Sequence, residues 1–402
     1  MRRRRMSAPM AVVIVLLLVL FDACSGDSRP SATGADSATG HDHGGSVASS
    51  ELPPPAPPTT PAPAVTAAPP VDIYAADRPN QLSPVVASFP SLIYVPNSES
   101  NTVDVIDPST MQIVNHFDVG QEPQHVVPSY DLKTLYVAAD QGNSLTPIDP
   151  ATGQPGPPIP VDDPYNLYFT PDGRFAVVVA ERLARLDFRD PHTFQLIKSL
   201  PVPCAGVDHM DFAVDGSYLI ASCEFSGELI KIALGPDGPT FLGSLPLLQA
   251  SKPQDVKLSP DGTVFYVADM VGNGVWEIDG DNLSVLGFLP TGLGAHGIYV
   301  SRDSKDLYVS NRGEGSVSVV DLATRSVRTT WHIPGGGSPD MGGVSADGTT
   351  LWLSGRSNSE VYAIDTTTGE LRARIPVGAG PHGLCVYPQP GRFSLGHTGV
   401  FR

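Results

Sequence analysis

Four of the ten histidines recur at matching places in the chain. Each follows a short turn that contains Gly, Pro or Asp and precedes a short apolar run. If these runs are equivalent strands that begin at one end of a common axis, their imidazoles lie around that axis. Imidazole nitrogens are ligands for copper, zinc and iron. The sequence therefore predicts a candidate metal site formed by His125, His209, His296 and His382.

A second interpretation of these histidines stays open. His296 and His382 directly precede a Gly, whereas His125 and His209 stand one position later, at the place of that Gly. Adjacent residues of a strand point to opposite faces. The four rings would then not all converge, and they would only shape the start of each strand.

Acidic residues accompany the histidines. Asp208, Asp255 and Asp340 occupy neighbouring positions in their own segments, where they could act as further ligands or orient the imidazoles. Asp211 follows His209 by two residues, which places both side chains on one side of a strand and suggests a general base. A hydrolase that uses this base is therefore an alternative to a metal site. No nucleophile elbow or phosphate-binding loop accompanies the pair.

These residues belong to a repeat. Aligned on the start of one strand, seven segments begin at His125, Asn166, His209, Asp255, His296, Met341 and His382, with separations of 41, 43, 46, 41, 45 and 41 residues. Each period contains about four short apolar runs separated by turn residues. This pattern is typical of a β-propeller blade. We predict an all-β fold with seven four-stranded antiparallel blades.

The two ends of the repeat are incomplete in complementary ways. The last unit, from His382, lacks its outer strands, and the region from Leu92 supplies them. We therefore expect the ring to close by pairing N-terminal and C-terminal strands. Val85 to Ser88 and Phe393 to Leu395 also resemble strands, and eight blades is the alternative.

Short motifs repeat at the second strand of the units: Tyr94-Val95-Pro96-Asn97, Tyr136-Val137, Tyr266-Val267-Ala268-Asp269 and Tyr308-Val309-Ser310-Asn311. A Gly/Ser turn and an apolar strand ending in Asp follow each. The chain resembles the YVTN-repeat (YncE-like) family of seven-bladed β-propellers over residues 84 to 402. The resemblance implies the fold and says little of function, because propellers host unrelated activities.

Alternating strand direction places the starts of first strands and the turns between second and third strands on one face of the ring, which we call the top face. Arg312 and Arg356 lie in such turns and are candidates for contact with an anionic ligand or a partner. Cys204 and Cys223 also fall on this face of one blade, so we expect a disulfide between them in an oxidising compartment.

The N-terminal region predicts export. Four arginines and an apolar run from Ala11 to Phe21 indicate a signal peptide over residues 1–23, too short to span a bilayer. Cys24 resembles the acylated cysteine of a bacterial lipoprotein. Residues 24–70 are rich in Ser, Ala and Pro and indicate a disordered tether. The propeller is expected over residues 71–402.

The formal net charge of −17 argues against nucleic-acid binding, which requires clustered cationic side chains. The sequence thus favours an exported, monomeric propeller that acts as a binding scaffold in the cell envelope or as a secreted protein. Its membrane attachment would come from a lipid on Cys24. Metal binding at the four histidines and lactone hydrolysis are the alternatives.

Overall fold

The computed structural model describes residues 71–397 and 401–402. The predicted signal peptide, Cys24 and the tether lie outside the described residues. Within the part of the chain that is described, no helix is long and apolar enough to cross a membrane.

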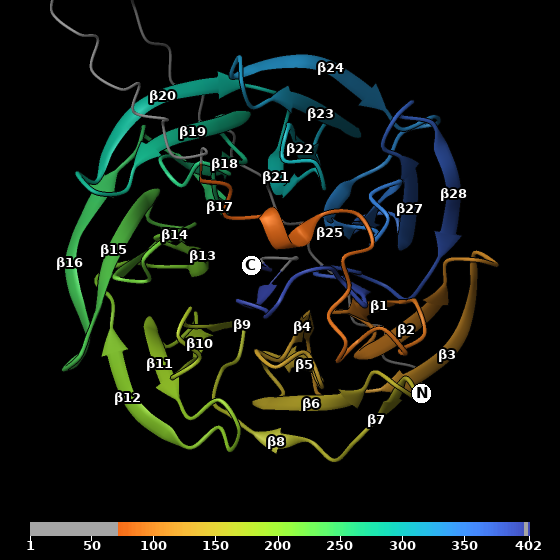
Figure 1. The fold of residues 1–402 in the computed structure, drawn as a ribbon, viewed down its shortest axis with the longest axis horizontal. Coiled ribbons are helices and arrows are strands. Elements are labelled where there is room, and N and C mark those ends of the chain that lie inside the picture. Colours follow the sequence, from red (N-terminus) through yellow and green to blue (C-terminus); the bar gives the residue numbers. More distant parts are fainter. Residues whose placement is uncertain (1–70, 398–400) are drawn as a thin grey trace, which may run out of the picture. The chain divides into compact units, whose positions relative to one another are not determined.

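The described strands form seven antiparallel sheets arranged around one axis, as Figure 1 shows. The predicted seven-bladed propeller is confirmed. Blades 1 to 3 contain β29 (Cys385–Tyr387), β1 (Leu92–Asn97), β2 (Thr102–Asp107) and β3 (Gln112–Asp118); β4 (Pro123–Pro128), β5 (Leu135–Ala139), β6 (Ser144–Asp149), β7 (Gln154–Pro155) and β8 (Ile159–Pro160); β9 (Asn166–Phe169), β10 (Ala176–Ala180), β11 (Arg185–Arg189) and β12 (Leu196–Pro201).

The remaining blades continue in chain order. Blades 4 to 7 contain β13 (Val207–Phe212), β14 (Tyr218–Cys223), β15 (Glu228–Gly235) and β16 (Gly238–Pro246); β17 (Pro253–Leu258), β18 (Phe265–Asp269), β19 (Gly274–Asp279) and β20 (Ser284–Pro290); β21 (Ala295–Val300), β22 (Asp306–Asn311), β23 (Ser316–Asp321) and β24 (Ser326–His332); β25 (Pro339–Val344), β26 (Thr350–Gly355), β27 (Glu360–Asp365) and β28 (Leu371–Pro376).

The apolar core lies between neighbouring sheets. Innermost strands such as β4 and β25 are buried along their whole length, whereas outer strands such as β3 contain only exposed and half-buried residues. Trp352 of blade 7, for example, packs in one cluster with Ile93 of blade 1. A blade alone would expose both faces of its inner strands to water, so each sheet is stabilised by burial against the next.

The ring closes in the predicted way. β29 pairs with β1 in the register Leu92↔Tyr387, Ile93↔Val386 and Tyr94↔Cys385. The segment Val85–Ser88 forms turns, and Ser394 makes only an isolated bridge, to Phe401, so neither segment adds an eighth blade.

Both ends of the described chain lie at the end of the channel opposite the top face. The short 3-10 helix η1 (Ala75–Asp77) and the C-terminus are close to the axis in Figure 1. Tyr74 donates a hydrogen bond to the carbonyl of Leu258, where β17 ends. Arg402 donates to the carboxylate of Asp211 and to the carbonyl of Phe212, where β13 ends. These contacts fix both ends of the described chain to the lower ends of innermost strands.

Candidate functional site

The four predicted histidines lie at the axis, where the innermost strands start. His125 belongs to β4, His209 to β13 and His296 to β21. His382 lies three residues before the start of β29. All four are buried, with exposed fractions between 0% and 3%. The propeller thus buries four imidazoles in the upper part of its channel.

The four rings form a chain and not one cluster. Ring centroids are 5.5 Å apart for His125 and His209, 4.8 Å for His125 and His382, and 5.9 Å for His296 and His382. The structure therefore divides the predicted set. His125 and His209 lie at one end of the chain, and His296 and His382 lie at the other.

A fifth histidine completes the first group. His397, in the C-terminal segment, has its ring centroid 4.3 Å from that of His125 and 4.7 Å from that of His209. Each of the three residues offers a ligand nitrogen, and these nitrogens lie within 4.8 Å of one another. We call His125, His209 and His397 the histidine cluster. Sequence reasoning missed His397 because it lies outside the repeat and reaches the axis only through ring closure.

Several nitrogens of the histidine cluster lack hydrogen-bond partners. Within the described residues, both ring nitrogens of His125 and the Nε2 atoms of His209 and His397 are buried and unpaired. Nδ1 of His209 lies 3.2 Å from the amide nitrogen of Asn166 and 3.4 Å from the hydroxyl of Tyr168. The amide nitrogen of Asn166 can only donate, and the hydroxyl of Tyr168 is free to donate, so Nδ1 accepts and the neutral ring carries its proton on Nε2. Buried unpaired polar atoms are rare and costly, so a group that binds them is expected.

The histidine cluster is electrically neutral at pH 7. Burial lowers the pKa of His125, His209 and His397 well below the ordinary value, and nearby cationic groups and the other imidazoles lower it further. Neutral imidazole is the form that binds a metal ion.

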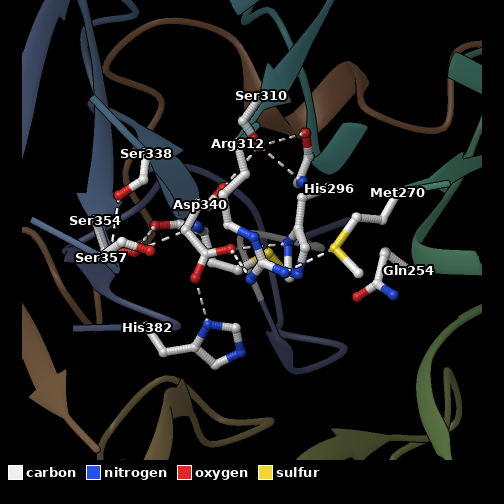
Figure 2. A network of polar contacts seen from close by, with 12 residues as sticks. Gln254, Met270, His296, Ser310, Arg312, Ser338, Asp340, Ser354, Ser357 and His382 are labelled. Atoms are coloured by element: carbon white, nitrogen blue, oxygen red, sulfur yellow. Dashed lines mark hydrogen bonds and ion pairs between the residues drawn. The ribbon is translucent and has the colours of Figure 1, made fainter. Parts of the chain in front are cut away.

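The second group is organised by Asp340, as Figure 2 shows. Its carboxylate lies 2.7 Å from Nδ1 of His382 and 3.1 Å from Nδ1 of His296, and Nη1 of Arg312 lies 3.1 Å from Oδ1. Burial would raise the pKa of Asp340, but its interactions with His296, Arg312 and His382, which include the hydrogen bond from His382, hold it well below its usual range. Burial and the charge of Arg356 lower the pKa of His382 to about 4, although Asp340 opposes this. The hydrogen bond to Asp340 therefore fixes the ring orientation of His382, and His296 lies within ion-pair distance of the same carboxylate.

The three predicted acidic residues have different surroundings. Asp340 orients His382 and lies beside His296, as described above. Asp255 accepts hydrogen bonds from the backbone nitrogens of Val256 and Ile298, so it links blades 5 and 6. Asp208 is fully buried, neither of its oxygens has a hydrogen-bond partner in the described chain, and Oδ1 lies 3.6 Å from Nε2 of His209.

The expected pair of His209 and Asp211 does not form. The register of β13 against β14 shifts between Val207 and Met210, so the simple alternation of side chains is interrupted there. Asp211 accepts hydrogen bonds from Arg402 and from the backbone nitrogen of Leu258 instead. This general-base prediction from spacing was wrong.

The remaining predicted residues lie on the top face. Arg312 contacts Asp340 and also lies with Nη2 2.7 Å from Sδ of Met270. Arg356 is half-buried, and its Nη1 is unpaired among the described residues. Cys204 and Cys223 form a disulfide, and Cys385 is a buried free thiol.

Comparisons with known proteins agree with this architecture. One curated relative is the 6-phosphogluconolactonase of Serratia proteamaculans (strain 568), which is 23% identical over 256 residues, covering 57% of this chain and 77% of the relative. A functionally unknown protein from Desulfotomaculum acetoxidans matches with a TM-score of 0.63 and 17% identity, over 73% of this chain and 98% of that one.

Two further solved structures are similar in fold. A proposed 6-phosphogluconolactonase from Bacteroides uniformis has a TM-score of 0.61 and 18% identity, over 74% of this chain and 99% of that one. Hydrazine synthase of Kuenenia stuttgartiensis has a TM-score of 0.58 and 18% identity, over 73% and 97% of the two chains. At such identities the likeness shows the fold alone. The sequence model described as YNCE-like beta-propeller matches residues 65–391, and the chain therefore belongs to that family.

Proposed function

We propose that this propeller is a rigid scaffold that binds one transition metal ion at the histidine cluster. The observation that carries the proposal is the group of three buried, neutral imidazoles with ligand nitrogens within 4.8 Å of one another and with unpaired nitrogens in each ring. Zinc, copper and iron are the ions that imidazole ligands suit.

The spacing of the nitrogens fits such an ion after small side-chain rotations. Zinc–nitrogen bonds are about 2.0–2.1 Å long, so two ligand nitrogens of a tetrahedral site lie roughly 3.4 Å apart. Nitrogens within 4.8 Å of one another need to close by at most about 1.4 Å. The rings come from β4, from β13 and from the C-terminal segment, and neighbouring blades hold these strands in place.

Elemental analysis of protein purified without a histidine tag tests this proposal. We expect about one equivalent of a transition metal after equilibrium dialysis, and its loss in the double variant His125→Phe/His209→Phe. The matched control is His332→Phe, because His332 is exposed at the end of the outer strand β24. Wild-type protein that retains no metal, or a double variant that retains as much as the control, contradicts the proposal.

Lactone hydrolysis is a second candidate, and the names of the relatives from Serratia and Bacteroides favour it. In this chain the base would be His382, whose Nδ1 is held by Asp340 and whose Nε2 lies 3.5 Å from the hydroxyl of Tyr165. Its 3% exposure favours a bound ion over a sugar-sized substrate. Turnover of 6-phosphogluconolactone that falls when His382 is replaced by Gln would support this candidate, and the absence of turnover would reject it.

We further propose that the protein is exported and carries a lipid on Cys24, which would attach the propeller to the cell envelope. The arginines, the apolar run and Cys24 of the N-terminal sequence support this. Mass spectrometry of the mature N-terminus tests it. An acylated Cys24 is the expected result, and an unmodified N-terminus at another residue contradicts lipid attachment.

A further inference from the structure

A separate cavity lies nearer the lower end of the channel. Its volume is about 30 Å³, and residues of the innermost strands β4, β17, β21, β25 and β29 border it. Tyr74, Asp77 of η1 and Phe401 from the C-terminal end of the chain complete its wall. None of the five buried histidines at the axis is among the residues that border it. The cavity is therefore a second space in the channel, distinct from the histidine cluster.

An unpaired ammonium group borders this cavity. Lys257 is the fifth residue of β17 and is only 2% exposed. Its Nζ atom is buried and has no hydrogen-bond partner among the described residues. An ammonium group carries three donors and no acceptor, and burying it without a partner is costly. An acceptor inside the cavity would remove that cost.

The carboxylates nearest to Lys257 along the chain and across the blade are occupied by other donors. Both oxygens of Asp255 accept hydrogen bonds from backbone nitrogens, one from β17 itself and one from β21. Asp211 accepts from Arg402 with one oxygen and from the backbone of β17 with the other. In the described chain, neither carboxylate therefore supplies a partner for Nζ of Lys257.

The wall of the cavity carries more positive than negative charge. Besides Lys257, its strongly basic or acidic side chains are Arg302 and Asp77. The buried guanidinium of Arg302 donates hydrogen bonds to neutral acceptors, namely two backbone carbonyls and the side-chain oxygen of Gln389. Burial raises the pKa of Asp77 well above its usual range, although Arg302 and Arg402 oppose this, and its neutral form is favoured. At most one negative charge thus opposes two positive charges.

The size of the cavity limits what could bind there. A water molecule needs roughly 10–15 Å³ of such volume, so a cavity of about 30 Å³ holds about two particles of that size. A halide ion is comparable in size to a water molecule and fits this space. Oxyanions with a tetrahedral centre, such as phosphate and sulfate, are too large for it.

We propose that this cavity is a binding site for a halide ion, which accepts a hydrogen bond from Nζ of Lys257. The ion would contact a wall built from innermost strands and from both ends of the described chain, so its binding would stabilise the closed ring. The proposal is independent of metal binding at the histidine cluster.

Urea unfolding in bromide tests the site in solution. Sodium gluconate replaces sodium bromide at constant ionic strength, because the gluconate ion is too large for the cavity. An ion that binds only the folded protein stabilises it by mass action, so a tenfold rise in bromide should lower the unfolding equilibrium constant by up to about tenfold. In Lys257→Met this dependence should disappear. The variant should be at least as stable as the wild type in gluconate, because it replaces an unpaired buried charge with an apolar chain.

The matched control is Lys305→Met, because the side chain of Lys305 is 78% exposed. It should retain the wild-type dependence on bromide. Crystals soaked in bromide and measured on both sides of the bromine absorption edge provide the second readout. We expect an anomalous peak in the cavity, in contact with Nζ of Lys257 and missing from crystals of Lys257→Met. Wild-type crystals without a peak in the cavity, or an equal bromide dependence in Lys257→Met and Lys305→Met, would overturn the proposal.

Discussion

Replacing His397 by Phe separates a ligand role from a structural one. Phe keeps a ring of similar size at a position with 1% exposure but removes the Nε2 atom, which has no partner in the described chain. Exchanging an unpaired buried polar group for an apolar one of the same shape is nearly neutral or stabilising. The metal-free variant should therefore unfold at a urea concentration equal to or above that of the wild type.

The effect on metal affinity should be large. Structural zinc sites with four ligands have apparent binding free energies of about 10–16 kcal/mol, which is roughly 3 kcal/mol for each ligand. Since 1.4 kcal/mol corresponds to a factor of ten, loss of one imidazole should raise the Kd for Zn²⁺ roughly 100-fold. The structure offers three imidazoles, so no spare ring of the cluster would compensate.

Isothermal titration of metal-free protein with Zn²⁺ at pH 7 provides the assay, with His332→Phe as the control because His332 is exposed. The control should match the wild type. An unchanged Kd in His397→Phe would refute the assignment of the C-terminal segment to the site. A variant that is strongly destabilised without metal would instead indicate a structural role for His397.

Three further predictions concern stability and are measured by denaturant unfolding. Burial and neighbouring acids raise the pKa of Glu181 to about 8, against roughly 4.3 in an unfolded chain. The destabilising effect of this carboxylate is therefore absent below about pH 4 and complete above about pH 8. Glu181→Gln should be more stable than the wild type at pH 9 and equal to it at pH 4, and equal unfolding midpoints at pH 9 would contradict this. Trp352→Ala removes a ring with 1% exposure between blades 7 and 1 and should cost about 3–5 kcal/mol; a loss under about 1 kcal/mol would show that this contact does not hold the ring closed. Arg402→Ala leaves Asp211 buried without its cation and should cost about 3–5 kcal/mol; the variant Arg402→Ala/Asp211→Asn should recover part of the loss, and no recovery would count against the ion pair.

The fold could be predicted from the sequence because every blade repeats the same alternation of strand and turn. Closure at β29 and β1 followed from the missing outer strands after His382 and their presence after Leu92. The position of His125, His209 and His296 at the axis likewise follows from their place at the start of innermost strands.

The details of the site depend on features that the repeat does not encode. His397 belongs to no blade, so only ring closure brings it beside His125. The bulge after Val207 changes the direction of the following side chains and separates His209 from Asp211. The pairing of His296 and His382 through Asp340 depends on the distance between three different strand segments, which spacing along the chain does not determine.

Crystals of tag-free protein soaked with Zn²⁺ and measured on both sides of the zinc absorption edge test the central claim most directly. The account predicts one strong anomalous peak among the imidazoles of His125, His209 and His397, within bonding distance of a nitrogen from each. A zinc-soaked crystal that shows no anomalous peak there, or peaks only at exposed side chains, would contradict it.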